Sequence, residues 1–237
     1  MDEFSQDSLL DLCPVCGHRE FNFQKVLWQE LVEEWELSSD EAAYIDLQQG
    51  FCCARCKNNL RSMTLAAAFT RAFGFPGNFA DFCRGDPQIR ASSVIEVNPA
   101  GTLSHLLEIL PQHELYCFPQ IDLQRMTFEN DSIDVIHSDT LEHVPDSGEA
   151  LQESHRVLKR GGRLFYTIPI VIGRLTRTRH GLPASYHGKR DTPRTDYTVQ
   201  TEYGADFWCE IFEAGFQEVA LTSLVFPASV AICVTKT

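Results

Sequence analysis

The sequence predicts an α/β fold: a mostly parallel sheet that ends in an antiparallel C-terminal hairpin, joined to a small N-terminal module. From about Ser92, short apolar runs alternate with helical segments, which is typical of a parallel sheet with crossover helices. Before that point the chain is organised around two Cys-x-x-Cys pairs. We therefore expect two domains, residues 1–85 and residues 86–237.

Apolar patterning places the individual elements. In the first domain, Leu27, Leu31 and Trp35 have helical spacing and predict a helix over 26–37, and a second helix is expected over 62–73. The last two strands follow each other too closely for a crossover helix, so they should pair antiparallel. In the second domain, strands are expected at 93–97, 115–118, 133–138, 163–168, 218–223 and 229–235, and helices at 103–110, 148–157 and 205–214.

Composition narrows the class of protein. The net charge of −13 argues against a protein that tracks nucleic-acid phosphates, which needs clustered lysine and arginine. No apolar run is long enough to span a bilayer, and the acidic, polar start lacks the basic and apolar regions of a secretory signal. We therefore expect a cytoplasmic protein with no membrane partner.

The cysteine pairs, Cys13-Pro-Val-Cys16 and Cys53-Ala-Arg-Cys56, predict a structural zinc site. Two intervening residues let a tight turn place both sulfurs about 2.3 Å from one tetrahedral zinc ion, and Gly17 suits the left-handed backbone of such a turn. An odd total of nine cysteines opposes a disulfide framework. Unpaired buried cysteines and a redox dithiol are the alternatives, and Cys52 could replace Cys53 as a ligand.

Between Phe128 and Pro169 the parts follow a distinctive order. A polar turn leads into the strand at 133–138, followed by Leu141-Glu-His-Val, a helix, Val157-Leu-Lys-Arg-Gly-Gly and another strand. This order closely resembles the class I methyltransferase superfamily, which uses S-adenosylmethionine. The resemblance implies a Rossmann-like, seven-stranded methyltransferase sheet and S-adenosylmethionine-dependent methyltransferase activity.

The resemblance also implies a cofactor site over the carboxyl ends of the strands, where open parallel sheets bind their ligands. Glu96 would position the methionine end of the cofactor, and the loop Asn98–Gly101 would pass close under it. Asp122 would accept a hydrogen bond from the adenine amine, and Leu123 would cover the adenine face. Ser138 would lie near the sulfonium or the adenosine.

This sequence departs from the superfamily at two places. Asn98 and Ala100 stand where glycines are common, although asparagine tolerates a positive φ better than most residues. The acid that usually ends the second strand and holds the ribose hydroxyls is missing from Leu115-Tyr-Cys-Phe-Pro. A non-catalytic interaction protein on a degenerate methyltransferase fold is therefore an alternative to an enzyme.

A narrower resemblance bears on the acceptor. Bacterial methyltransferases with an N-terminal four-cysteine zinc-knuckle module also carry a downstream arginine, here Arg61, and a Tyr-His-Gly element, here at 186–188. Many of them are found among sugar and polysaccharide functions, which implies O- or N-methylation of a small-molecule or glycan acceptor. An RNA methyltransferase is disfavoured by the net charge and by the sparse basic residues near the cysteines.

The polar segment 173–201 is the expected acceptor-binding region. It gathers Arg174, Arg177 and Arg179 in an acidic protein, which predicts either recognition of a phosphate or carboxylate, or a solvated loop. His187 is the candidate general base, because an unperturbed histidine pKa of about 6.5 suits proton removal from a hydroxyl.

Overall fold

The computed structural model describes residues 9–186 and 198–237. Within these residues the chain forms two compact units, and each unit gathers segments that are distant in sequence. The first unit comprises Met1–Ser92, Ala100–His113 and Leu221–Cys233, and the second comprises Ser93–Pro99, Glu114–Ala220 and Val234–Thr237. The division of the chain at residue 85 stays a prediction.

Helices dominate the first unit. In its segments Met1–Ser92 and Ala100–His113 the elements are β1 (Phe21–Phe23), α1 (Gln29–Glu34), α2 (Ser39–Gly50), β2 (Phe51–Cys53), α3 (Leu60–Ala72), α4 (Phe79–Gly85), α5 (Pro87–Ala91) and α6 (Ser104–Leu107). Strands β1 and β2 pair antiparallel. Helix α3 is buried on all sides along residues 60–70, and most of its buried residues are apolar, although Arg61, Ser62, Thr64 and Thr70 are also buried.

Local hydrogen bonds explain where the helices of the first unit begin. Helix α3 begins after Asn59, whose side chain accepts a hydrogen bond from the N–H of Ser62 at 2.9 Å. Helix α1 is shorter than the 26–37 expected from the sequence. The carboxylate of Asp46 accepts hydrogen bonds from the backbone of Val26 and Leu27, both at 2.7 Å, and holds that stretch outside the helix.

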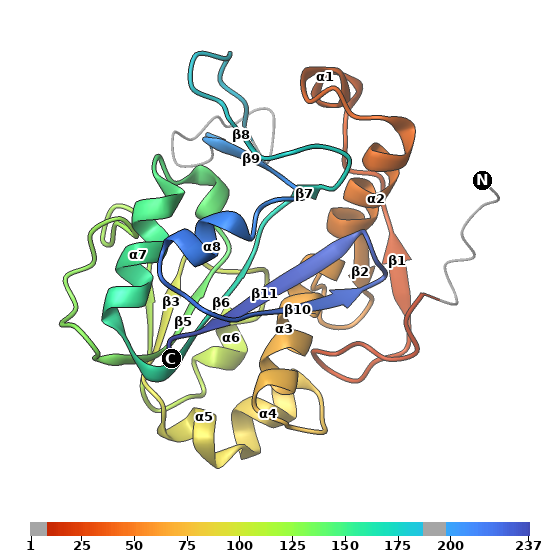
Figure 1. Cartoon of the computed structure of the whole chain (residues 1–237). Coiled ribbons are helices and arrows are strands. Elements are labelled where there is room, and N and C mark those ends of the chain that lie inside the picture. The colour runs from red at the N-terminus through yellow and green to blue at the C-terminus, as the bar shows by residue number, and fades with distance from the viewer. Residues whose placement is uncertain (1–8, 187–197) are drawn as a thin grey trace. The chain divides into compact units, whose positions relative to one another are not determined.

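Six strands form the main sheet in the order β10-β11-β6-β5-β3-β4 (Figure 1). They are β3 (Val94–Val97), β4 (His113–Tyr116), β5 (Ile133–Ser138), β6 (Leu158–Thr167), β10 (Val219–Leu224) and β11 (Ser229–Thr235). Strands β3, β5 and β6 are parallel, and β10 and β11 form the antiparallel hairpin. The mostly parallel α/β sheet is therefore confirmed.

The strand count differs from the seven that the family resemblance implied. All six strands expected from the apolar runs are present, and the main sheet contains no seventh among the described residues. The chain after β6 instead forms a separate small sheet, β7 (Ile170–Val171), β9 (Thr201–Gly204) and β8 (Arg177–Thr178), in that order. These strands are too short to give an alternating apolar pattern, so the sequence did not predict them.

The remaining elements of the second unit are η2 (Leu141–His143), α7 (Ser147–Val157) and α8 (Cys209–Glu213). Helix α7 begins at Asp146, whose carboxylate accepts a hydrogen bond from Glu149 N–H at 2.9 Å. It was expected over 148–157 and is observed within one residue of that range. No helix among the described residues has both the length and the apolar character needed to cross a membrane.

Candidate functional site

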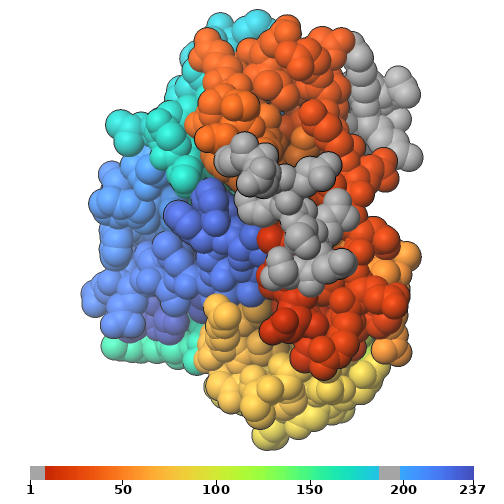
Figure 2. All heavy atoms as spheres, turned by 90° about the vertical axis from the view of Figure 1, so that its right-hand side faces the viewer, coloured from red at the N-terminus to blue at the C-terminus, as the bar shows by residue number. Residues whose placement is uncertain are grey.

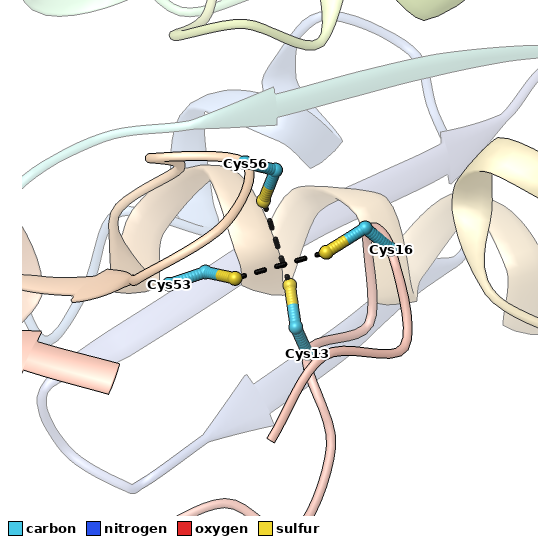
Figure 3. A group of neighbouring side chains, drawn as sticks. All are labelled: Cys13, Cys16, Cys53 and Cys56. Carbon is cyan, nitrogen blue, oxygen red and sulfur yellow. Dashed lines mark hydrogen bonds between the residues drawn. The ribbon is translucent and has the colours of Figure 1, made fainter. Parts of the chain in front are cut away.

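Four cysteine sulfurs cluster in the first unit, all within 4.8 Å of one another. They are the predicted set Cys13, Cys16, Cys53 and Cys56, and Cys52 is outside it. The sulfurs of Cys13 and Cys56 are 3.7 Å apart, as are those of Cys16 and Cys53. Figure 3 shows these two contacts crossing, as opposite edges of a tetrahedron do.

This geometry fits zinc. Four sulfurs placed tetrahedrally about 2.3 Å from a zinc ion are about 3.8 Å from one another. The two observed 3.7 Å separations therefore match opposite edges of such a site. None of the nine cysteines forms a disulfide, so no disulfide competes for the four sulfurs.

The two cysteine turns share one backbone pattern. The carbonyl of the first cysteine accepts a hydrogen bond from the residue four positions later, Gly17 in one turn at 2.8 Å and Lys57 in the other at 3.0 Å. Both donors have left-handed backbones, with φ of 72° and 62°. The left-handed conformation predicted for Gly17 is therefore confirmed, and Lys57 adopts it in spite of its side chain. We call these turns the first and second knuckles.

The thiols of the cluster differ in their pKa values. A hydrogen bond from the Cys13 thiol, together with hydrogen bonds from Asn58, holds the pKa of Cys56 well below its ordinary value. The same pairing and burial raise the pKa of Cys13, and burial raises that of Cys16. Thiols that remain protonated must lose their protons when a metal binds, so metal affinity should fall as the pH falls.

The second candidate region is the carboxyl edge of the parallel strands in the second unit. Val97, Ser138 and Tyr166 are in register across β3, β5 and β6. The residues that come next along the chain therefore lie at the same edge of the sheet. They are Asn98 after Val97, Asp139 after Ser138 and Thr167 after Tyr166. Ligands of open parallel sheets bind at this edge.

Glu96 lies one residue before that edge, in register with His137 on β5. Its carboxylate is 3.8 Å from Nε2 of His137, and both side chains have no exposed surface. The structure thus places Glu96 at the predicted end of β3, beside a buried histidine that the sequence did not single out. At this distance the two side chains form an ion pair when the imidazole is protonated.

Asn98 has the left-handed backbone expected of a glycine substitute, with φ of 57°. Its N–H donates to the carbonyl of Tyr116 at 2.9 Å, and its side-chain oxygen accepts from the N–H of Phe118 at 3.3 Å. Asn98 therefore fixes the chain after β3 to the chain after β4. A glycine would supply the backbone conformation but not the second hydrogen bond.

The other predicted cofactor residues fall as follows. Gly101 belongs to the first unit and is also left-handed, with φ of 58°. Asp122 is exposed, and its carboxylate accepts a hydrogen bond from the N–H of Gln124 at 2.9 Å, which makes it part of a tight turn. Leu123 is buried, and Ser138 is buried with its hydroxyl 3.1 Å from that of Thr140.

Two further features of these regions were missed by sequence reasoning. Asp139 accepts a hydrogen bond from the Thr167 hydroxyl at the carboxyl edge, and its position directly after Ser138 could have revealed it. The pairing of Asn58 with Thr102 joins residues 44 apart in the chain, and no spacing pattern signals it.

The arginines of the acceptor segment converge on one buried acid. Arg174, Arg177 and Arg179 all form ion pairs with Glu202 on β9, whose side chain has no exposed surface. Charge-assisted hydrogen bonds of this kind are strong when they are buried. These arginines therefore hold the small β7-β9-β8 sheet together, which the sequence alone did not reveal. The candidate base His187 lies outside the described residues.

A comparison with known protein families gives a match in the region of the parallel strands. Residues 87–166, from α5 through most of β6, match the family model described as a methyltransferase domain. This segment includes the predicted residues Glu96, Asn98, Asp122 and Ser138. The resemblance inferred from the sequence is therefore confirmed: the central segment carries a methyltransferase domain. No curated protein matches the chain.

Several solved structures are similar at low identity. One belongs to a Haloferax volcanii complex between the Trm112 methyltransferase activator and a protein described as a methyltransferase. The identity is 12%, the match covers 75% of this chain and 97% of that chain, and the TM-score is 0.43. An S-adenosylmethionine-dependent methyltransferase from Thermotoga maritima is 15% identical over 72% of this chain and 94% of its own, with a TM-score of 0.38. With TM-scores this low, no function is inferred from these likenesses.

Proposed function

We propose that this protein is an S-adenosylmethionine-dependent methyltransferase. The observation that carries the proposal is the methyltransferase domain match over 87–166. The structure supports it at one point where the sequence departs from the family. Asn98 supplies the left-handed backbone that a glycine usually provides in the cofactor loop.

In the proposed site, each residue has one task. Glu96 orients the methionine end of the cofactor from the end of β3, and Asn98 shapes the loop beneath it. Asp122 and Leu123 hold the adenine, and Ser138 faces the adenosine from the end of β5. Bound S-adenosylmethionine supplies the methyl group as an electrophilic sulfonium. Transfer to an acceptor is an in-line displacement, so the protein contributes chiefly by positioning the two reactants.

We propose a small-molecule or glycan acceptor, bound with the help of the segment 173–201. The ion pairs of three arginines with Glu202 indicate that the start of this segment is ordered and is not a solvated loop. The net charge of −13 opposes an RNA acceptor. Retention on RNA that falls steeply with salt would contradict this choice of acceptor.

We further propose that the four cysteines hold a structural zinc ion. Four thiolates complete the tetrahedral shell and leave no position open for a reacting water, unlike a catalytic zinc site. The knuckles instead anchor neighbouring elements. The carbonyls of Pro14 and Val15 accept hydrogen bonds from Phe79 and Ala80 at the start of α4. Figure 2 shows the red segment that carries the first knuckle directly beside the yellow surface of α4 and α5.

Calorimetric titration with S-adenosylmethionine and S-adenosylhomocysteine tests the enzyme proposal. We expect the wild-type protein to bind both ligands. Asp122→Asn should weaken binding about tenfold, because a charged acceptor for the adenine amine is replaced by a neutral one. Asp131→Asn is the matched control, since Asp131 is an exposed acid of the same unit that pairs with Lys236. Absence of binding at millimolar ligand would overturn the proposal and favour a non-catalytic interaction protein.

A further inference from the structure

Asn58 occupies a central place in the second knuckle. It follows Lys57, and its carbonyl accepts a hydrogen bond from the N–H of the ligand Cys53 at 3.0 Å. Asn58 is only 1% exposed, so its amide must find partners within the protein. The backbone of Asn58 thus holds the backbone of one of the four proposed metal ligands.

The same amide holds a second segment of the chain. Its nitrogen donates to the hydroxyl of Thr102 at 2.7 Å, and its oxygen accepts from the N–H of Thr102 at 3.0 Å. The Thr102 hydroxyl in turn donates to the carbonyl of Cys56 at 3.0 Å. Three hydrogen bonds therefore fasten Thr102 to the knuckle, one of them directly to the backbone of a metal ligand.

Gly101 shows how closely this segment approaches the knuckle. A Cβ atom on Gly101 would lie 2.8 Å from the side-chain oxygen of Asn58 and 2.8 Å from the hydroxyl of Ser62. Gly101 also has a φ of 58°, which favours glycine. The backbone of Gly101 and Thr102 is thus fixed both by its contacts and by its conformation.

We propose that Asn58 is a positioning residue that couples the four-cysteine metal site to the loop Asn98–Thr102. The coupling rests on the proposed function, in which Asn98–Gly101 is the cofactor loop. A metal ion fixes the second knuckle, the knuckle fixes Thr102 and Gly101, and these residues continue directly through Ala100 and Pro99 to Asn98. With the metal bound, the loop is already partly ordered before the cofactor arrives. The loop therefore loses less conformational freedom when the cofactor binds.

The first test removes the connection without touching a metal ligand. Thr102→Val keeps the side-chain shape but leaves Asn58 and the Cys56 carbonyl without the hydroxyl, whereas Thr102→Ser keeps the hydroxyl. For the zinc-loaded protein, we expect Thr102→Val to raise the Kd for S-adenosylhomocysteine about tenfold and Thr102→Ser to change it less than about twofold. Equal Kd values for wild type and Thr102→Val would overturn the coupling.

The second test measures the coupling from the metal side. Coupling between two ligands is reciprocal, so S-adenosylhomocysteine should tighten zinc binding, measured by competition with a chromophoric chelator, by about tenfold in wild type. This factor should fall to about one in Thr102→Val. A factor that is the same in both proteins would contradict the proposal.

Hydrogen exchange separates this inference from the proposed function. In the absence of cofactor, peptides that contain Thr102 should exchange more slowly in the zinc-loaded protein than after chelation, and Thr102→Val should remove part of that protection. If wild type fails to bind S-adenosylhomocysteine but this protection is observed, the methyltransferase proposal falls while the link between knuckle and loop stands. Exchange that is independent of zinc would overturn the link itself.

Discussion

Gly101 lies at a position where both the backbone conformation and the surrounding atoms exclude a larger residue. Its left-handed backbone alone would strain any other residue, and its surroundings leave no space for a Cβ atom. Gly74, at the end of α3, is a natural counterpart in the same unit. It has a similar φ of 66° but no atom within 4 Å of the position that a Cβ would take. The pair therefore separates backbone strain from close packing.

We expect Gly101→Ala to lower the free energy of unfolding by about 2–4 kcal/mol, from left-handed strain plus a forced displacement of Asn58 and Ser62. Gly74→Ala should cost only about 1–2 kcal/mol, because it carries the strain without the clash. Urea unfolding of the two variants beside wild type measures both values. Equal losses would show that the knuckle yields easily at Gly101.

Asp134 connects three parallel strands of the second unit. Its carboxylate accepts hydrogen bonds from the N–H and hydroxyl of Ser93, before β3, at 2.9 and 2.8 Å. It also accepts one from Lys159 on β6 at 2.8 Å. Burial by itself raises the pKa of Asp134, but the hydrogen bonds from Lys159 and Ser93 outweigh it and hold the pKa below its ordinary value.

The depressed pKa sets the sign of a pH effect. The charged carboxylate stabilises the fold above the ordinary aspartate pKa of about 3.9, and this stabilisation is lost as the pH falls through the lower folded-state value. At pH 7, Asp134→Asn should cost about 1 kcal/mol, a value discounted for solvent screening. The deficit relative to wild type should shrink below about pH 4, as followed by urea unfolding over a pH series. A deficit that is independent of pH would rule out the charge as its source.

The four-cysteine cluster is tied to several elements of the first unit. The first knuckle accepts hydrogen bonds from α4, and the second knuckle precedes α3 and binds Thr102. We expect the purified protein to contain about one zinc ion per chain by elemental analysis, because the described residues include one cluster of four cysteines that could bind a metal ion. Removal of the ion by a chelator should lower the Tm, since binding free energy is also folding free energy.

Cys52 and Cys53 are neighbours in the chain, so substituting each in turn tests which of them binds the metal. Cys53→Ser should abolish stoichiometric zinc and lower the Tm, because it removes a ligand from the sulfur cluster. Cys52→Ser should leave both nearly unchanged, because Cys52 lies outside the cluster and its sulfur faces the carbonyl of Gln49 at 3.9 Å. Loss of zinc from Cys52→Ser with retention in Cys53→Ser would reverse the assignment of the ligand.

The sequence by itself determined the elements whose signals are local. Apolar periodicity located the six strands of the main sheet, and two Cys-x-x-Cys spacings located the sulfur cluster. Asn98 was recognised as a glycine substitute because asparagine tolerates a positive φ. Each of these signals lies within a short stretch of chain, such as one strand or one Cys-x-x-Cys pair, so each can be read from the sequence.

Only the tertiary structure decided the features that depend on distant residues. Three such features join separate segments of the chain. Glu96 is buried against His137, three arginines form ion pairs with Glu202, and Thr102 is hydrogen-bonded to Asn58. Helix α1 begins later than expected because Asp46, in the following helix α2, binds the backbone of Val26 and Leu27. Hydrogen bonds and buried charges select partners by position in space, and one sequence carries no periodicity that encodes such a position.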